Sequence, residues 1–141
     1  MERVFHAPRE LVFKAHTDPN LIPKWWGRRA YTTTVDKLEL RVGGVWRFVQ
    51  RDADGNEYAF NGVYREIVPP ERLSYTFEFE GMPGHVLVET LTFEDLNGKT
   101  RLTVTGSYQS VEDRDGILQS GMEEGANESY AQLDELLETL M

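Results

Sequence analysis

Two ionisable residues that could take part in chemistry lie four positions apart in one expected strand, 85–94. Glu89 alternates with Leu87 and Leu91, so all three side chains share one face if the segment is extended. Apolar surroundings raise the pKa of a carboxyl group and suit it to donate a proton or to anchor a polar ligand group. His85 falls on the same face as a second possible acid or base. Alternatively, this end of the strand is open to water and both groups are solvated.

The sequence lacks the residues or motifs that several other kinds of chemistry require. The chain has no cysteine, which excludes thiol catalysis, disulfides and cysteine-based zinc sites. His6 and His16 have no partner at metal-ligand spacing, so we expect no metal. Nucleophile-elbow, phosphate-binding and dinucleotide-binding motifs are also missing. We therefore expect no cofactor.

Length and charge narrow the class of protein. A chain of 141 residues fits a single domain spanning 1–141. Its formal net charge of −9 argues against partners with a phosphate backbone, that is, nucleic acid, and against adsorption to anionic membranes. No apolar run approaches the roughly 20 residues of a membrane span, and no signal sequence begins the chain. We expect a soluble, cytoplasmic protein.

Most of the chain follows the two-residue period of β-strands. The expected strands are 2–6, 32–35, 45–51, 57–67, 72–80, 85–94 and 100–108. Asp54-Gly55-Asn56 and Asn97-Gly98 predict hairpin turns between neighbouring strands. Short connections favour an antiparallel sheet of about seven strands.

Helices are expected at both ends of the chain. Pro8 suits the start of a helix to about His16, and Asp18-Pro19 predicts a second short helix that runs into Trp25-Trp26-Gly27. Near the C-terminus, Ser120 and Glu123 fit a capping box.

The segment after this capping box has the pattern of one long amphipathic helix. Apolar residues recur there every three or four positions. About 20 residues would extend roughly 30 Å, enough to cross a sheet. The sequence thus predicts an α+β fold in which a curved sheet wraps around the C-terminal helix, with two short helices after the first strand and a space between sheet and helix.

Aromatic residues of the sheet and small residues of the long helix could line that space. The candidate ligand-binding residues are Trp25, Trp46, Phe48, Phe60, Tyr75, Phe77, Glu89, Met122, Gly125 and Ser129. The aromatic side chains could instead fill a close-packed core. Gly125 could make room for a ligand, or it could allow close packing or a kink. Gly62 more simply marks curvature of a strand.

Acidic residues gather near the expected helix starts. They include Glu112, Asp113 and Asp115, and later Glu123 and Glu124. Negative charge is favoured there by the helix dipole, which is the ordinary interpretation. A patch that binds a partner protein is the alternative.

A series of motifs resembles one known family. Residues 7–13 (APRELVF), Thr17-Asp18-Pro19 and Trp25-Trp26-Gly27 are similar to the N-terminal signature of the activators of the ninety-kilodalton heat-shock chaperone ATPase and their homologues. Later blocks at 43–46, 60–63, 69–73, 100–103 and 120–125 follow in the same order. These families belong to the START-like SRPBCC superfamily, so the resemblance implies a helix-grip fold over a hydrophobic cavity.

The resemblance leaves three functions to be distinguished, because one fold hosts many activities. The preferred hypothesis is binding of a small hydrophobic molecule, such as a lipid, polyketide or aromatic metabolite. The second is a cyclase- or hydrolase-type enzyme that uses Glu89 or His85 to move a proton. The third is a co-chaperone-like module, which is weakened because we expect only the START-like domain. A homodimer is also plausible, since exposed sheet edges invite pairing.

Overall fold

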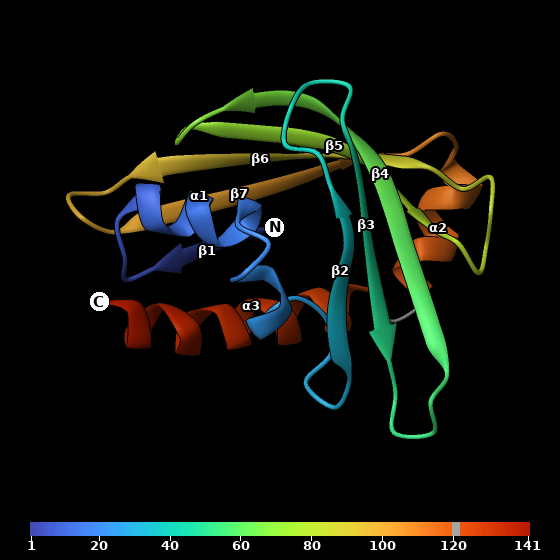
Figure 1. The fold of residues 1–141 in the computed structure, drawn as a ribbon. Coiled ribbons are helices and arrows are strands. Elements are labelled where there is room, and N and C mark those ends of the chain that lie inside the picture. The colour runs from blue at the N-terminus through green and yellow to red at the C-terminus, as the bar shows by residue number, and fades with distance from the viewer. Residues whose placement is uncertain (120–121) are drawn as a thin grey trace.

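The computed structural model describes the backbone of residues 1–119 and 122–141, and the side chains of all residues except 117–122. It contains one seven-stranded antiparallel sheet in the order β1-β7-β6-β5-β4-β3-β2 (Figure 1). The strands are β1 (Glu2–Phe5), β2 (Thr32–Leu38), β3 (Val45–Arg51), β4 (Glu57–Val68), β5 (Arg72–Phe79), β6 (Leu87–Asp95) and β7 (Thr100–Ser107). The helices are α1 (Arg9–Thr17), η1 (Ile22–Lys24), α2 (Val111–Gln119) and α3 (Met122–Leu140). The predicted α+β helix-grip fold is confirmed.

Both predicted hairpins are present. The turn between β6 and β7 places Asn97 and Gly98 in the left-handed region, at φ 56° and 95°, which is why an Asn-Gly pair suits it. Gly55 takes the same region in the turn between β3 and β4, at φ 84°. The seven strands agree with the sequence periodicity to within about three residues at each end.

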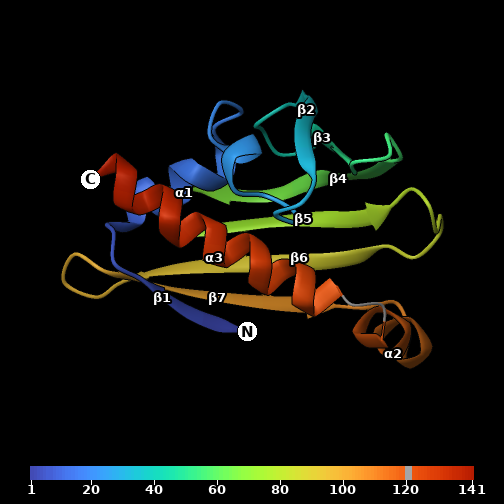
Figure 2. The ribbon, with the colours of Figure 1, turned by 90° about the horizontal axis from the view of Figure 1, so that it is seen from below.

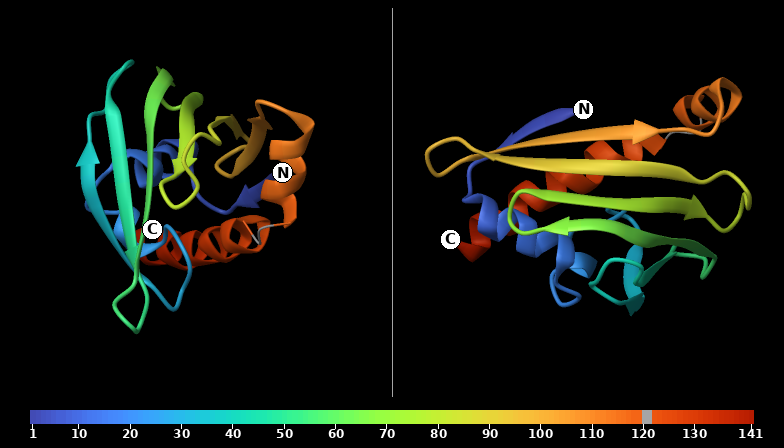
Figure 3. Two further views of the ribbon diagram at one scale, coloured as in Figure 1. Left: turned by 90° about the vertical axis from the view of Figure 1, so that its right-hand side faces the viewer. Right: turned by 90° about the horizontal axis from the view of Figure 1, so that it is seen from above.

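The sheet is strongly curved. In Figure 1, β2 to β4 run steeply across the direction of β5 to β7, and Figure 3 shows the sheet bending around α3. The pairing of β4 with β5 shifts register between Tyr64 and Glu66. At Gly62 a Cβ atom would clash with the carbonyl oxygen of Thr76 and crowd Trp46, so glycine permits the close approach of strands at this bend.

The two helical segments after β1 differ from each other. Helix α1 begins directly after Pro8, as predicted, and buries Val12, Phe13 and Ala15. The second predicted helix is wrong in extent, since η1 is a single 3₁₀ turn. Pro23 lacks the N–H group that a continued helix from Pro19 would need.

Helix α2 is an element that the sequence analysis did not predict. Ser110 lies just before it, and its Oγ accepts a hydrogen bond from the backbone N–H of Asp113 at 3.0 Å. This is the N-cap arrangement, and Glu112 and Asp113 supply the acidic first turn. The acidic cluster at 112–115 is thus part of a helix start.

Helix α3 crosses the concave face of the sheet diagonally (Figure 2). Its buried residues Ser129, Tyr130, Leu133 and Leu137 follow the predicted stripe. The proposed capping box includes Ser120, which lies outside the described residues. None of the described helices is both long enough and apolar enough to cross a membrane.

The core has two ends with different packing. At the end beneath α1, the side chains are almost wholly inaccessible, and we call this set the closed end: Phe5, Val12, Phe13, Leu91, Phe93, Leu102 and Leu133. At the other end the inner face of the sheet carries a group of aromatic residues and Glu89, and we call this set the aromatic end: Trp46, Phe48, Phe60, Tyr75, Phe77 and Glu89.

Candidate functional site

Glu89 and Tyr75 form a polar pair on the inner face of the sheet. They lie directly opposite each other on β6 and β5, and the Tyr75 hydroxyl donates a hydrogen bond to Glu89 Oε1 at 3.2 Å. Their strand neighbours on the same face, Leu73, Phe77, Leu87 and Leu91, are buried. Glu89 and Tyr75 nevertheless keep part of their accessible surface, so the side chains around them leave some room.

The surroundings of Glu89 favour its neutral form. Burial raises the pKa of Glu89 from its ordinary value of 4.5 to about 7, and the hydrogen bond from Tyr75 offsets part of that increase. Burial and the nearby Glu89 charge also raise the pKa of Tyr75 and of Tyr130 well above 10. Near neutral pH, Glu89 can therefore both donate and accept a proton, while the two tyrosines stay protonated.

Aromatic rings form the wall next to this pair. The Trp46 ring lies 5.7 Å from the Tyr75 ring and 4.8 Å from the Phe48 ring, centroid to centroid. Phe60 and Phe77 continue the wall at a centroid distance of 5.6 Å. The structure thus brings five of the predicted aromatic residues together in one wall, and one of them, Tyr75, contacts Glu89.

Trp25 lies apart from that group. Its ring stacks on Tyr130 at 5.8 Å, and its Nε1 donates to the carbonyl oxygen of Ala15 at 2.9 Å. Trp26 instead contacts the wall, with its ring 5.1 Å from Phe48 and 5.3 Å from Phe60. The two adjacent tryptophans therefore face different parts of the interior.

His85 does not lie beside Glu89. Strand β6 begins at Leu87, so the expected start of the strand at residue 85 is wrong and the alternation does not extend to His85. This histidine is exposed, and its Nδ1 lies 2.8 Å from Asp113 Oδ1 of α2. It links the loop before β6 to α2.

Ser129 on α3 holds backbone groups of the chain. Its hydroxyl accepts a hydrogen bond from the N–H of Gly27 at 2.7 Å and lies within 3.0 Å of the Gly27 carbonyl oxygen. Gln132 Nε2 donates to that same carbonyl at 2.7 Å. Glu128 Oε1 accepts from the N–H of Arg29 at 2.6 Å. We call this arrangement the Gly27 clamp, and it fastens the end of the Trp-Trp-Gly segment to α3.

The other two predicted helix residues are not seen at Glu89. A Cβ atom at Gly125 would meet the Arg28 guanidinium first, at 3.7 Å, so the missing side chain leaves room beside Arg28. The side chain of Met122 lies outside the described ones.

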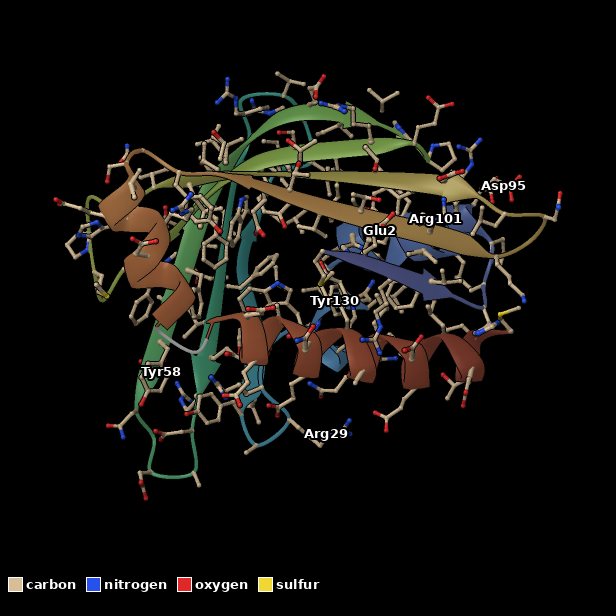
Figure 4. The ribbon with its side chains drawn as sticks, turned by 180° about the vertical axis from the view of Figure 1, so that it is seen from behind. Glu2, Arg29, Tyr58, Asp95, Arg101 and Tyr130 are labelled. Carbon is tan, nitrogen blue, oxygen red and sulfur yellow. The ribbon has the colours of Figure 1, made fainter. Side chains whose placement is uncertain are left out.

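Two residues that the sequence analysis did not choose take part in the interior. Tyr130 points from α3 toward the sheet (Figure 4) and is 9% exposed; its place in the apolar stripe was the available signal. His16 packs its ring 4.8 Å from Trp25 and 6.1 Å from Tyr130. Burial lowers the pKa of His16 to about 4, and Nδ1 lies 2.8 Å from the Val12 carbonyl. Its buried Nε2 has no hydrogen-bond partner among the described residues.

Two small hollows lie elsewhere on the molecule. One, of about 310 Å³, lies between β1 and the end of α3, and the other, of about 320 Å³, is lined by Arg65, Arg72 and the hydroxyls of Ser74 and Thr90. Neither hollow is lined by Glu89 or Tyr75, the two residues of the polar pair. In the described part of the chain, no three histidine or acidic side chains gather as metal ligands would.

Comparison with solved structures supports the same architecture. A Mycobacterium smegmatis protein is 30% identical and superposes with a TM-score of 0.87, covering 96% of this chain and 87% of that one. A Rhodobacter sphaeroides protein is 29% identical with a TM-score of 0.91, covering 100% of this chain and 92% of that one.

Sequence comparison extends the likeness to curated proteins. The mouse protein named activator of 90 kDa heat shock protein ATPase homolog 1 is 31% identical over 107 residues, which is 75% of this chain and 28% of the mouse protein. The human protein of the same name is 29% identical over the same length. The chain therefore spans less than a third of these relatives. The family profile described as "Activator of Hsp90 ATPase homolog 1-like protein" matches residues 6–138, and the chain belongs to this family.

Proposed function

We propose that this protein binds a small hydrophobic molecule between the sheet and α3, with Glu89 and Tyr75 as its polar anchor. One observation carries the proposal: a carboxyl group lies on the concave face, hydrogen-bonded to Tyr75 at 3.2 Å and walled by aromatic rings, yet remains partly accessible. Ligand sites combine apolar walls with a few polar groups in this way. Lipids, polyketides and aromatic metabolites are the candidate classes, and we place the function in the cytoplasm.

The burial pattern along α3 supports the proposed location. The first half of the helix presents small residues, Gly125, Ala126 and Ser129, whereas the second half presents Leu133 and Leu137. Ala126 and Phe60 pack against the core but stay partly accessible. We therefore place the ligand beside Ala126 and the aromatic end, where the side chains of α3 are small.

Native mass spectrometry of freshly purified protein, followed by denaturing extraction, is the direct test. We expect an additional mass that disappears on unfolding, or saturable uptake of an added apolar probe such as phenylbutanol. Ala126→Leu should reduce this uptake at least about fivefold, because the added atoms would occupy the space above the aromatic wall.

Asn127→Leu is the matched control, because residue 127 is the exposed neighbour on the same helix. It should bind the probe as the unaltered protein does. The proposal fails if no apolar probe saturates, or if both leucine variants bind equally well.

The pKa of Glu89 supports a second candidate function. A carboxyl group that titrates near 7 can act as a general acid or base at neutral pH, which suits a cyclase or hydrolase. Glu89→Gln should then keep binding and lose turnover. His85 takes no part in this catalytic mechanism, because its side chain lies at the surface beside Asp113.

Interaction with a chaperone is a third candidate, suggested by the names of the curated relatives. Because the chain spans only 28% of their length, a pull-down with the cognate ninety-kilodalton chaperone is required. A stoichiometric complex would support this function, and its absence would remove it. Size-exclusion chromatography with light scattering would test the expected homodimer.

A further inference from the structure

Glu89 is an inward-facing, half-buried acid that forms no ion pair with a cation in the described part of the chain. Its pKa responds to burial and to the Tyr75 hydrogen bond, and no lysine or arginine forms an ion pair with it there. Buried charges are normally paired. A neutral hydrogen-bond donor is all that the described residues supply.

Two basic residues, Arg3 and His16, interact with Tyr130 but supply no charge to Glu89. Arg3 pairs with Asp134 at 2.6 Å, and it acts on Tyr130 from the β1 side. His16, on α1, is neutral at pH 7 because burial lowers its pKa to about 4. From β5 and α3, Tyr75 and Tyr130 face Glu89 as neutral phenols.

The rings around Glu89 suit a positively charged group. Tyr75 contacts the carboxyl directly, Trp46 packs on Tyr75, and Tyr130 is close enough for the Glu89 charge to raise its pKa. The faces of tyrosine and tryptophan rings attract cations, more strongly when water is excluded. The net charge of −9 also favours the approach of a cation.

We infer that the ligand of this site is a hydrophobic amine, whose protonated nitrogen pairs with the Glu89 carboxylate among Tyr75, Tyr130 and Trp46. The inference rests on the proposed function and specifies the ligand class. The ammonium group supplies the charge that Glu89 lacks, and the apolar body of the ligand contacts the aromatic wall.

Three probes with the same skeleton provide the test: phenylbutylamine, phenylbutanol and phenylbutyrate, titrated by calorimetry at pH 8. We expect the amine to bind at least about tenfold more tightly than the alcohol, and the carboxylate to bind most weakly. Glu89→Gln should remove the preference for the amine, so that the amine and the alcohol bind this variant with affinities within about twofold of each other. Glu94→Gln, an exposed position on the same strand, should leave all three affinities unchanged.

The pH dependence gives a second readout. Lowering the pH from 8.5 to 5.5 protonates a carboxyl group of pKa about 7, so amine binding should weaken roughly thirtyfold while alcohol binding stays constant. Equal binding of amine and alcohol, or a preference that survives in Glu89→Gln, overturns the amine assignment and leaves hydrophobic binding standing. Failure of all three probes to bind overturns the amine assignment and counts equally against the proposed function.

Discussion

The closed end and the aromatic end are built on the same sheet and under the same helix, but they are filled differently. At the closed end, Phe93 and Leu133 are 2% and 0% exposed, and α1 covers them. At the aromatic end, Phe60, Tyr75 and Glu89 face inward but remain partly accessible. Under the proposed function, the difference teaches that stability and binding are separated along one helix: Leu133 and Leu137 are buried at the closed end, whereas Ala126 stays partly accessible nearer the start of the helix.

The largest expected effect compares one phenylalanine from each end. Phe93→Ala should lower the free energy of unfolding by about 3–5 kcal/mol, because its ring packs on Phe13 and His16 with no room to relax. Phe60→Ala should cost about half as much, because that ring is already partly accessible. Urea unfolding of both variants measures the difference, and equal losses would contradict the distinction between the two ends.

The second prediction concerns the acid at the aromatic end. Glu89 has a pKa of about 7 in the folded protein and near 4.5 when unfolded, so the folded state binds the proton more tightly. The contribution of Glu89 to stability should therefore fall as the pH rises from about 4.5 to 7, and then level off. The buried His16, whose pKa is lowered to about 4, contributes the opposite change between about pH 4 and 6.5, so the Glu89 part is read from the difference between the variant and the unaltered protein.

Replacing Glu89 with a residue that does not titrate should abolish its contribution to the pH dependence. Relative to the unaltered protein, Glu89→Gln should gain up to about 3 kcal/mol at pH 8 compared with pH 4. Denaturant titrations at the two pH values measure it. Glu94→Gln is the control. If the difference in unfolding free energy between Glu89→Gln and the unaltered protein is the same at both pH values, Glu89 is solvated.

A smaller effect tests the Gly27 clamp, which fastens the Trp-Trp-Gly segment to α3. Ser129→Ala should cost about 1–2 kcal/mol, because the half-buried N–H of Gly27 loses its partner at 2.7 Å. Thr139→Ala removes a similar hydroxyl-to-backbone bond at an exposed position of the same helix and should change stability by less than about 0.5 kcal/mol. Thermal unfolding would distinguish the two, and equal effects would argue against the clamp.

The smallest effect is expected at Gly125. Gly125→Ala should raise stability by up to about 1 kcal/mol, because alanine is the better helix former and its Cβ would make only ordinary contacts with Arg28. Gly116→Ala, in the open space of α2, should gain a similar amount. If Gly125→Ala lowers stability while Gly116→Ala does not, glycine is needed at position 125 for packing.

The sequence was informative where the signal is local. Period-two alternation predicts the strands because one face of each is buried, and Asn97-Gly98 predicts its turn because both residues accept positive φ. The capping residue Ser110 before α2 carried a similar local signal that the sequence analysis did not use.

The site was only partly predictable because it depends on contacts distant in sequence. Alternation correctly places Glu89 on the inner face, but its pairing with Tyr75 follows from the register of β5 with β6, which the long loop between them does not reveal. The Gly27 clamp joins residues 102 positions apart. His85 was misplaced because the strand starts two residues later than alternation suggested.

The environments of two tryptophans give the molecule internal spectroscopic reporters. The indole N–H of Trp25 is bonded to Ala15, whereas that of Trp46 is buried with no partner among the described residues. In a proton–nitrogen correlation spectrum, the two indole signals should therefore differ in chemical shift and in deuterium exchange. Occupancy of the aromatic end should move the Trp46 signal and leave the Trp25 signal nearly in place, so that binding and unfolding can be followed separately without attaching an external fluorophore or spin probe.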